Sequence, residues 1–197
     1  MPGKFIVIYG INNIGKSTQA KKLVEYLNQH GYKAEYLKYP IYDSLTGRKI
    51  SEILRSDKKQ KLTEEEFQTA YYRNRKDYEP TLKKKLADGI IIVAEDYIGT
   101  GLAWGSAKGA DYEKLKRQNS DLLKEDLAIL MDGERFVQAM EEKHLHERDA
   151  ELIAKVRQRH LDIGKEFGWK KVKANQPEDK VFQDILKLVK PIIPFLK

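Results

Sequence analysis

Residues 10–18 read Gly10-Ile11-Asn12-Asn13-Ile14-Gly15-Lys16-Ser17-Thr18, which fits G-x-x-x-x-G-K-[ST] at every fixed position. An apolar run, 5–9, precedes this segment and apolar residues at helical spacing follow it, which is the strand–loop–helix setting that the motif requires. In such a loop the backbone N–H groups turn towards a polyphosphate, and the start of the helix adds positive partial charge. We therefore predict a nucleoside triphosphate site, in which Lys16 reaches the β- and γ-phosphates and Ser17 holds Mg²⁺.

Strand and helix patterns alternate along the rest of the chain. Strands are expected at 5–9, 33–38, 89–94, 127–131 and 171–174, and helices from 16 to 31, near 134–142, at 149–166 and at 181–189. Thr63 and Glu66 form a capping box that starts a long helical stretch, which we expect to break or restart at Pro80. Strands that alternate with helices pair in parallel through right-handed crossovers. The predicted fold class is α/β, with a P-loop NTPase-type central parallel five-stranded sheet flanked by helices.

Composition narrows the class of protein. With 197 residues, of which 41% are hydrophobic and 34% charged, we expect a single domain over 1–197 with a real core. The absence of cysteine rules out disulfides, thiolate metal sites and cysteine nucleophiles. The apolar run at 5–9 is too short for a signal sequence or a membrane span. We therefore expect a cytoplasmic protein. The net charge of +7 suits anionic partners. Because the basic residues are dispersed among acidic ones, we expect small phosphorylated molecules and no nucleic acid or membrane.

A P-loop alone does not identify the reaction, because GTPases, ATPases and small-molecule kinases share it. The chain is too short for the further domains of a motor or helicase. It has no convincing Asn-Lys-x-Asp string, which reads guanine in GTPases, so a small nucleotide kinase is the leading interpretation.

Phe67, Tyr71 and Arg75 are four residues apart and share one helix face. An aromatic ring beside a guanidinium suits a nucleoside monophosphate, because the base can stack on the ring and the guanidinium can bind the phosphate with two hydrogen bonds. An aromatic core stripe with Arg75 at its rim fits the same spacing, and both interpretations stay open.

The chain resembles thymidylate kinases over nearly its whole length. The central resemblance is Asn74-Arg75, a helix ending in Leu86-Ala87-Asp88-Gly89, the apolar run Ile90 to Val93, then Tyr97 and Thr100-Gly101. Further matching features are the P-loop with Gln19, the Tyr39-Pro40 turn, Asp126-Leu127 before a strand that ends at Asp132, His146-Glu147-Arg148, and Trp169.

The resemblance implies transfer of the γ-phosphoryl group of ATP to dTMP, giving dTDP, with Mg²⁺ as cofactor and a homodimer as the assembly. It places Tyr71 at the base-stacking position, Arg75 at the monophosphate-binding position, Tyr97 beside the deoxyribose, and Thr100, Gly101 and Trp104 in the base pocket. It also makes 142–150 a lid over the ATP phosphates, in which Arg148 joins Lys16 in stabilising the transition state. Glu95 would organise Mg²⁺ or the acceptor.

Several positions depart from the family pattern. Asn12 replaces an acid of the P-loop, Asn13 stands where one branch carries an arginine, and Tyr42 replaces an arginine. The acid and arginine of the D-R-Y motif become Glu95 and Asp96, so that an anion stands where the family has a cation. Arg48 or Arg73 is a candidate to compensate for that arginine. In the lid, Lys143, His144 and His146 are expected to be exposed, and His30 and His160 to be surface or boundary residues.

Two other functions fit parts of this pattern. A deoxynucleoside kinase would suit Glu95 and a shortage of acceptor-site arginines, because its 5′-OH acceptor is uncharged. A nucleotide-binding pseudokinase would keep the P-loop without turnover. A comparison of thymidine with dTMP as acceptor separates the deoxynucleoside kinase from a thymidylate kinase. Tight ATP binding without turnover on any acceptor would favour the pseudokinase.

Overall fold

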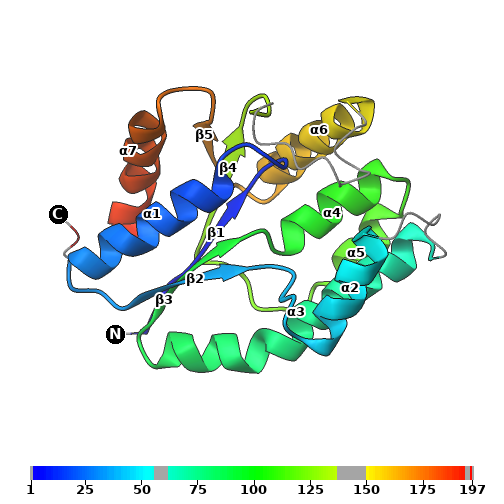
Figure 1. Cartoon of the computed structure of the whole chain (residues 1–197), viewed down its shortest axis with the longest axis horizontal. Coiled ribbons are helices and arrows are strands. Elements are labelled where there is room, and N and C mark those ends of the chain that lie inside the picture. The colour runs from blue at the N-terminus through cyan, green and yellow to red at the C-terminus, as the bar shows by residue number, and fades with distance from the viewer. Residues whose placement is uncertain (1, 56–61, 137–149, 194–195, 197) are drawn as a thin grey trace.

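A parallel five-stranded sheet forms the centre of this computed structural model, which describes residues 2–55, 62–136, 150–193 and 196 (Figure 1). The strands follow the order β2-β3-β1-β4-β5, and all four neighbouring pairs are parallel. They are β1 (Phe5–Tyr9), β2 (Ala34–Lys38), β3 (Ile91–Glu95), β4 (Leu127–Asp132) and β5 (Lys170–Lys173). The predicted fold class is confirmed, and each predicted strand lies within two residues of its expected bounds.

Helices cover both faces of the sheet. They are α1 (Lys16–Gln29), α2 (Leu45–Arg55), α3 (Glu64–Ala87), α4 (Ile98–Ala107), α5 (Tyr112–Gln118), α6 (Ala150–Glu166) and α7 (Glu178–Val189), followed by the 3₁₀ turn η3 (Lys190–Ile192). Helices α1 and α7 lie together on one side of the sheet, and α3, α4 and α6 lie on the other (Figure 1). This two-sided cover is what a parallel sheet requires, because the crossover helices bury both of its faces.

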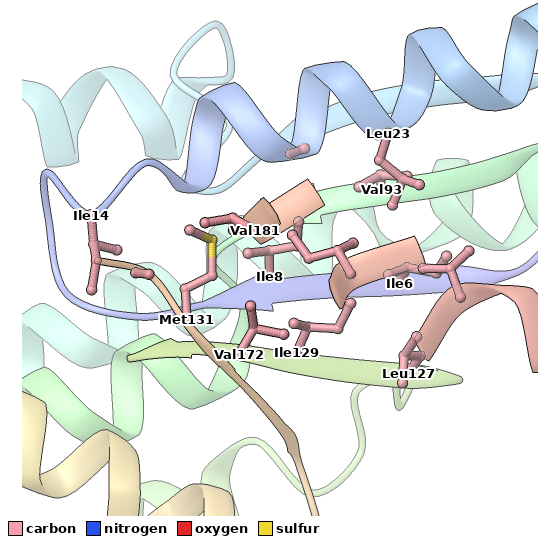
Figure 2. Close-up of a cluster of buried hydrophobic side chains, with 14 of the residues drawn as sticks. Ile6, Ile8, Ile14, Leu23, Val93, Leu127, Ile129, Met131, Val172 and Val181 are labelled. Carbon is pink, nitrogen blue, oxygen red and sulfur yellow. The ribbon is translucent and has the colours of Figure 1, made fainter. Parts of the chain in front are cut away.

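The central strand shows how the sequence pattern builds these layers. All five side chains of β1 are fully buried, and successive residues point to opposite faces of the sheet. Ile6 and Ile8 pack in the cluster that contains Leu23 of α1 and Val181 of α7 (Figure 2). The alternate residues of β1 pack in a second cluster with Leu82 of α3. A continuous apolar run is therefore divided between two cores.

One prediction about the helices is wrong, and a second is tested only at its start. Helix α3 runs unbroken through Pro80, because that residue is exposed and water can solvate the carbonyl that loses its N–H partner. The Thr63–Glu66 capping box at its start is formed as predicted. The helix expected near 134–142 does not begin at Glu134: residues 134–136 have no regular structure, and 137–142 lie outside the described residues. The Asn175 side chain accepts a hydrogen bond from Glu134 N and donates one to Glu134 O, which fixes that backbone in another conformation.

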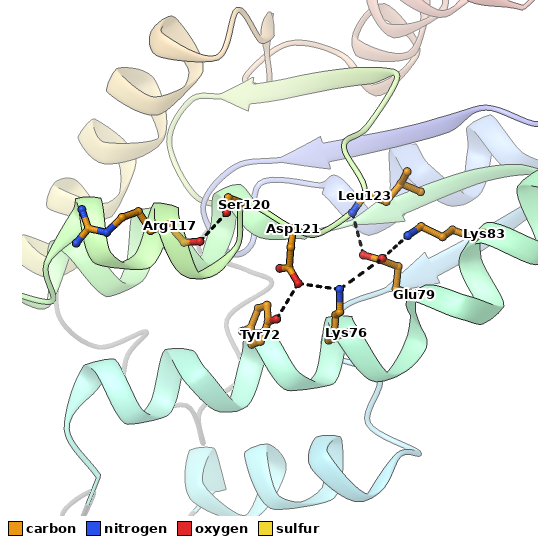
Figure 3. A network of polar contacts seen from close by, with 8 residues as sticks. All are labelled: Tyr72, Lys76, Glu79, Lys83, Arg117, Ser120, Asp121 and Leu123. Carbon is orange, nitrogen blue, oxygen red and sulfur yellow. Dashed lines mark hydrogen bonds and ion pairs between the residues drawn. The ribbon is translucent and has the colours of Figure 1, made fainter.

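A polar network joins α3 to the segment before β4 (Figure 3). Asp121 accepts hydrogen bonds from the Tyr72 hydroxyl at 3.1 Å and the Lys76 ammonium at 2.8 Å. Buried Glu79 accepts one from the backbone N–H of Leu123 at 2.8 Å. Removal of a buried carboxylate's partners is costly, so this network holds α3 in one position relative to the sheet. That matters because one face of α3 lines the cavity described next.

Candidate active site

The P-loop leaves the end of β1 and begins α1 at Lys16, as the sequence predicts. Gly10 has φ +143°, and a Cβ there would lie 2.6 Å from the carbonyl oxygen of Met131, so no other residue fits this turn. Gly15 at φ +89° precedes the helix, whose first turn contains no acidic residue. The N–H groups at the start of α1 therefore face a concave loop with no carboxylate of their own turn, which suits an anionic group.

Lys16 is buried under this loop. Its ammonium donates hydrogen bonds to the carbonyl oxygens of Gly10 and Ile11, each at 2.9 Å, and lies 3.7 Å from Asp96 Oδ1. A buried ammonium needs such acceptors, since its desolvation is costly. The same flexible side chain can exchange a carbonyl for a phosphate oxygen, because both are hydrogen-bond acceptors.

Glu95 ends β3 next to the P-loop. Its carboxylate is nearly fully buried, accepts a hydrogen bond from the Tyr36 hydroxyl at 2.5 Å and lies 3.1 Å from Lys38 Nζ. Burial raises the pKa of this carboxyl, but Lys16, Lys38 and a hydrogen bond from Ser17 outweigh it and hold the pKa below its usual value. Glu95 is therefore a carboxylate at neutral pH, in contact with the hydroxyl of Ser17.

The oxygens of Ser17 and Glu95 fit Mg²⁺, which prefers hard oxygen ligands and keeps several positions for water and substrate phosphates. Within the part of the chain that the structure describes, no three His, Cys, Asp or Glu side chains form a cluster that could hold a metal. A cation bound mainly by nucleotide phosphates needs no such cluster. The predicted metal residues are thus brought together.

Asp96 adopts φ +62°, in the left-handed region that Asp tolerates better than most residues. Its Oδ1 accepts a hydrogen bond from the Thr100 hydroxyl at 2.8 Å, besides lying close to Lys16. Burial, opposed by Lys16, raises the pKa of this carboxyl. The expected compensation by an arginine is wrong: Arg48 donates instead to the carbonyl of Asp43, and neither it nor Arg73 lines the cavity.

A cavity of about 770 Å³ extends from the P-loop to α3 and α4. It is lined by all the predicted binding residues within the described part of the chain except Gly10, which lies behind the loop. At the P-loop end these are residues 12–18, Glu95 and Asp96; at the other end they are Tyr71, Arg75, Tyr97, Thr100, Gly101 and Trp104. One cavity thus holds both halves of the predicted site.

The position of Arg75 decides whether it belongs to the core or to a binding pocket, which its spacing left open. Its side chain is 3% exposed, its guanidinium carbon lies 6.0 Å from the centre of the Tyr71 ring, and Nη1 donates to Asn119 at 3.1 Å. Burial lowers the pKa of this guanidinium, and Nε has no hydrogen-bond partner among the described residues. Phe67, one turn before Tyr71, is also buried and lines the same cavity. All three residues of this helix face therefore form cavity wall, and Phe67 packs against the Tyr71 ring as well.

Gly101 provides the space for this guanidinium. A Cβ at Gly101 would lie 2.7 Å from Arg75 Nη2 and 2.9 Å from Gln68 Oε1. The absence of a side chain on α4 thus allows Arg75 to lie flat against that helix. This role of Gly101 supports its predicted place in the pocket.

Two tyrosines line the cavity between its ends. Tyr97 is 1% exposed, and its ring contacts those of Phe5 and Tyr39, with centroids 5.1 and 5.0 Å away. The hydroxyls of Tyr39 and Tyr97 have no hydrogen-bond partner among the described residues. Buried hydroxyls without partners are uncommon, and both residues border a space that a polar ligand can enter.

Sequence reasoning missed Lys38, Tyr39 and Gln68 as cavity residues. Only Tyr39 had a signal, the Tyr-Pro turn after a predicted strand. Lys38 becomes part of the site through the pairing of β2 with β3, which places it beside Glu95. That register is a property of the folded sheet and has no local pattern.

The lid predicted at 142–150 falls almost entirely outside the described residues. The lid residues Lys143, His144, His146 and Arg148 lie within 137–149, and their roles stay predictions.

The two other histidines differ in exposure. His30 is exposed as expected, but His160 is 1% exposed, so its expected surface or boundary position is wrong. Its Nδ1 pairs with the carbonyl of Val156, and burial lowers its pKa to about 4.

Comparisons with known proteins agree with this geometry. The family model described as thymidylate kinase matches residues 8–185. The chain belongs to the thymidylate kinase family. It is 31% identical over 196 residues to the thymidylate kinase of Danio rerio, covering 97% of this chain and 92% of that protein, and 29% identical over 188 residues to that of Homo sapiens, covering 93% and 88%.

The fold of the family is also seen in a solved structure. Thymidylate kinase from Candida albicans superposes with a TM-score of 0.80 at 22% identity, over 97% of this chain and 92% of that one. Among the helices that the structure describes, none combines the length and apolar character needed to cross a bilayer.

Proposed function

We propose that this thymidylate kinase family member transfers the γ-phosphoryl group of ATP to dTMP, giving ADP and dTDP. The observation that carries the proposal is the single cavity with a P-loop at one end and the pair Tyr71–Arg75 at the other. A donor and an acceptor bound at these ends meet beside Glu95 and Asp96. Phosphoryl transfer requires mainly positioning and neutralisation of charge, which such a cavity can supply.

The donor half consists of residues 12–18. The backbone N–H groups of the loop and of the start of α1 bind the phosphates of ATP, and Lys16 leaves the carbonyl oxygens of Gly10 and Ile11 for phosphate oxygens. Lys16 then stabilises negative charge on the phosphoryl group during transfer. Ser17 and Glu95 are the residues that would hold Mg²⁺, and the bound cation supplies further neutralisation of the phosphate oxygens.

The acceptor half consists of residues on α3 and α4. The Tyr71 ring stacks on the base, and Arg75, whose Nε has no hydrogen-bond partner among the described residues, binds the monophosphate of the acceptor. Tyr97 packs beside the deoxyribose, in a position where a 2′-OH would meet its buried ring. Thr100, Gly101 and Trp104 complete the wall of the pocket.

Three further predictions remain proposals. We propose one catalytic domain over 1–197, a homodimer as the working assembly, and action in the cytoplasm. The first is supported by the family model, which spans 8–185 without interruption. The other two rest on the resemblance and on the composition of the chain.

A coupled assay of ADP release with a panel of acceptors tests the proposal. We expect ADP release that depends on dTMP and Mg²⁺ and exceeds release with thymidine or with other monophosphates. Release with thymidine in place of dTMP would establish a deoxynucleoside kinase. Tight ATP binding with no turnover on any acceptor would establish a pseudokinase. Either result would contradict the proposed reaction.

A further inference from the structure

The acceptor phosphate of dTMP has to approach the place where β3 ends at Glu95 and is followed by a second carboxylate, Asp96. This inference rests on the proposed function, because only a phosphorylated acceptor brings a dianion to that place. A carboxylate a few ångströms from a phosphate repels it, so the site needs a cation on the acceptor side. The question is which side chain supplies it.

The cavity is lined by four cationic side chains from the described part of the chain: Lys16, Lys38, Arg75 and Lys108. Lys16 belongs to the P-loop and contacts its carbonyl oxygens. Lys108 lies over the Trp104 ring, 5.7 Å from its centre, and forms an ion pair with Glu64 at 3.4 Å. It therefore lies at the far end of the cavity.

The guanidinium of Arg75 has other partners. It is packed against Tyr71 and Gly101, and its Nη1 donates to Asn119. It is thus held on the α3 and α4 side of the cavity, whereas the ion pairs of Glu95 and Asp96 are with Lys38 and Lys16. It does not account for the charge needed beside Glu95.

Lys38 lies beside Glu95, where the cation is needed. It ends β2, and the parallel register of β2 with β3 pairs Lys38 with Glu95 at the carboxyl edge of the sheet. Ligands of open α/β sheets bind along this edge. Its Nζ lies 3.1 Å from Glu95 Oε1, and its side chain is 47% exposed whereas that of Glu95 is 5% exposed.

From this position we infer that Lys38 binds the 5′-phosphate of the acceptor nucleotide and holds it beside Glu95. An ammonium has three donors, and the contact with Glu95 uses one of them. The others can reach a phosphate oxygen in the cavity that the side chain lines. Lys38 is then a binding residue for the charge of the acceptor, and a cation from β2 offsets the carboxylates at and just after the end of β3.

A structural ion pair is the simplest other role for Lys38. Such a role is small here, because a half-exposed ion pair contributes little to stability. Glu95 also keeps the hydrogen bond from Tyr36 and the nearby charge of Lys16 when Lys38 is removed. The two roles differ in what they affect: phosphate binding affects the affinity for dTMP, whereas neutralisation of Glu95 affects kcat and the dependence on Mg²⁺.

The test is a titration calorimetry series on the full chain with dTMP, thymidine and ATP, for the wild type, Lys38→Gln and Lys38→Arg. Lys33→Gln is the matched control, since Lys33 is an exposed lysine just before the other end of β2 and does not line the cavity. We expect Lys38→Gln to raise the Kd for dTMP about tenfold or more, as for loss of a charge-assisted hydrogen bond. The Kd values for thymidine and ATP should stay the same, Lys38→Arg should recover most of the dTMP affinity, and Lys33→Gln should match the wild type.

The outcomes separate this inference from the proposed function. An unchanged dTMP affinity in Lys38→Gln, or an equal loss for dTMP and thymidine, would overturn the role of Lys38 while the wild type still phosphorylates dTMP. So would a change confined to kcat and the Mg²⁺ dependence. A wild type that neither binds nor phosphorylates dTMP would overturn the proposed function, and the role of Lys38 with it.

Discussion

Replacement of Asp96 by arginine tests how this chain uses the carboxylate beside Lys16, at a position where the resemblance implies an arginine. Asp96 Oδ1 lies 3.7 Å from Lys16 Nζ and accepts a hydrogen bond from Thr100. It is therefore part of the surroundings that position the P-loop lysine. We expect Asp96→Arg to lower kcat/KM for dTMP, because the new cation faces Lys16 and removes its anionic neighbour.

The size of the effect follows from the distance. At 3.7 Å and an effective dielectric constant near 20, two unit charges interact by about 4 kcal/mol. An arginine whose guanidinium moves out to about 8 Å from Lys16 still repels it by about 2 kcal/mol, which corresponds to about 30-fold in kcat/KM. The left-handed backbone at Asp96 adds roughly 1 kcal/mol of strain, which affects stability and not the chemical step.

Steady-state kinetics with dTMP as the varied substrate measure this effect, with thermal unfolding as a check on folding. Asp96→Asn is the matched control, because its amide oxygen can still accept from Thr100 and Asn tolerates the same backbone conformation. It should lose less than Asp96→Arg, since it introduces no positive charge. A clear gain in kcat/KM for Asp96→Arg would mean that Asp96 opposes the acceptor phosphate and does not support Lys16.

Three further predictions concern the acceptor pocket and the core. Arg75→Ala should raise the KM for dTMP about tenfold or more and leave that for ATP unchanged; a loss of thermal stability with an unchanged KM would make it a core residue only. Gly101→Ala should raise the same KM by displacing Arg75, although alanine favours the helix, and an unchanged KM would disprove this packing. The buried neutral His160 has a pKa of about 4, below its unfolded value near 6.5, so the unfolded state binds the proton first and stability falls by about 3 kcal/mol as pH drops from 7 to 4. Denaturant unfolding of His160→Gln should show a shallower decline over that range, and an equal decline would contradict the role of His160.

Much of the fold is predictable because its signals are local. The fully buried strand β1, the P-loop and the Thr63–Glu66 capping box are each encoded within a few neighbouring residues. Pro80 and the segment after β4 show where this fails. An exposed face allows a proline inside α3, and Asn175, distant in sequence, fixes the backbone at Glu134.

The site likewise combines features that local sequence predicts with features that it does not. The spacing of Tyr71 and Arg75 predicts their common face, but only the packing of α4 shows that Gly101 gives the guanidinium its space. The placement of Lys38 beside Glu95 comes from the register between β2 and β3, and the contact of Asp96 with Lys16 comes from the approach of two loops. These are contacts between segments distant in the sequence, so residue type and spacing could not predict them.

We propose that the γ-phosphoryl group of ATP moves directly to dTMP in this cavity. The most direct measurement follows the label from γ-³²P-ATP in reactions with dTMP, for the wild type and Lys16→Ala. We predict that label enters dTDP in step with the formation of ADP, and that Lys16→Ala slows this by about 10²-fold or more, as for removal of a preorganised charge. ADP formed without labelled dTDP would rule out direct transfer to dTMP, and a Lys16→Ala rate close to that of the wild type would rule out the role of Lys16.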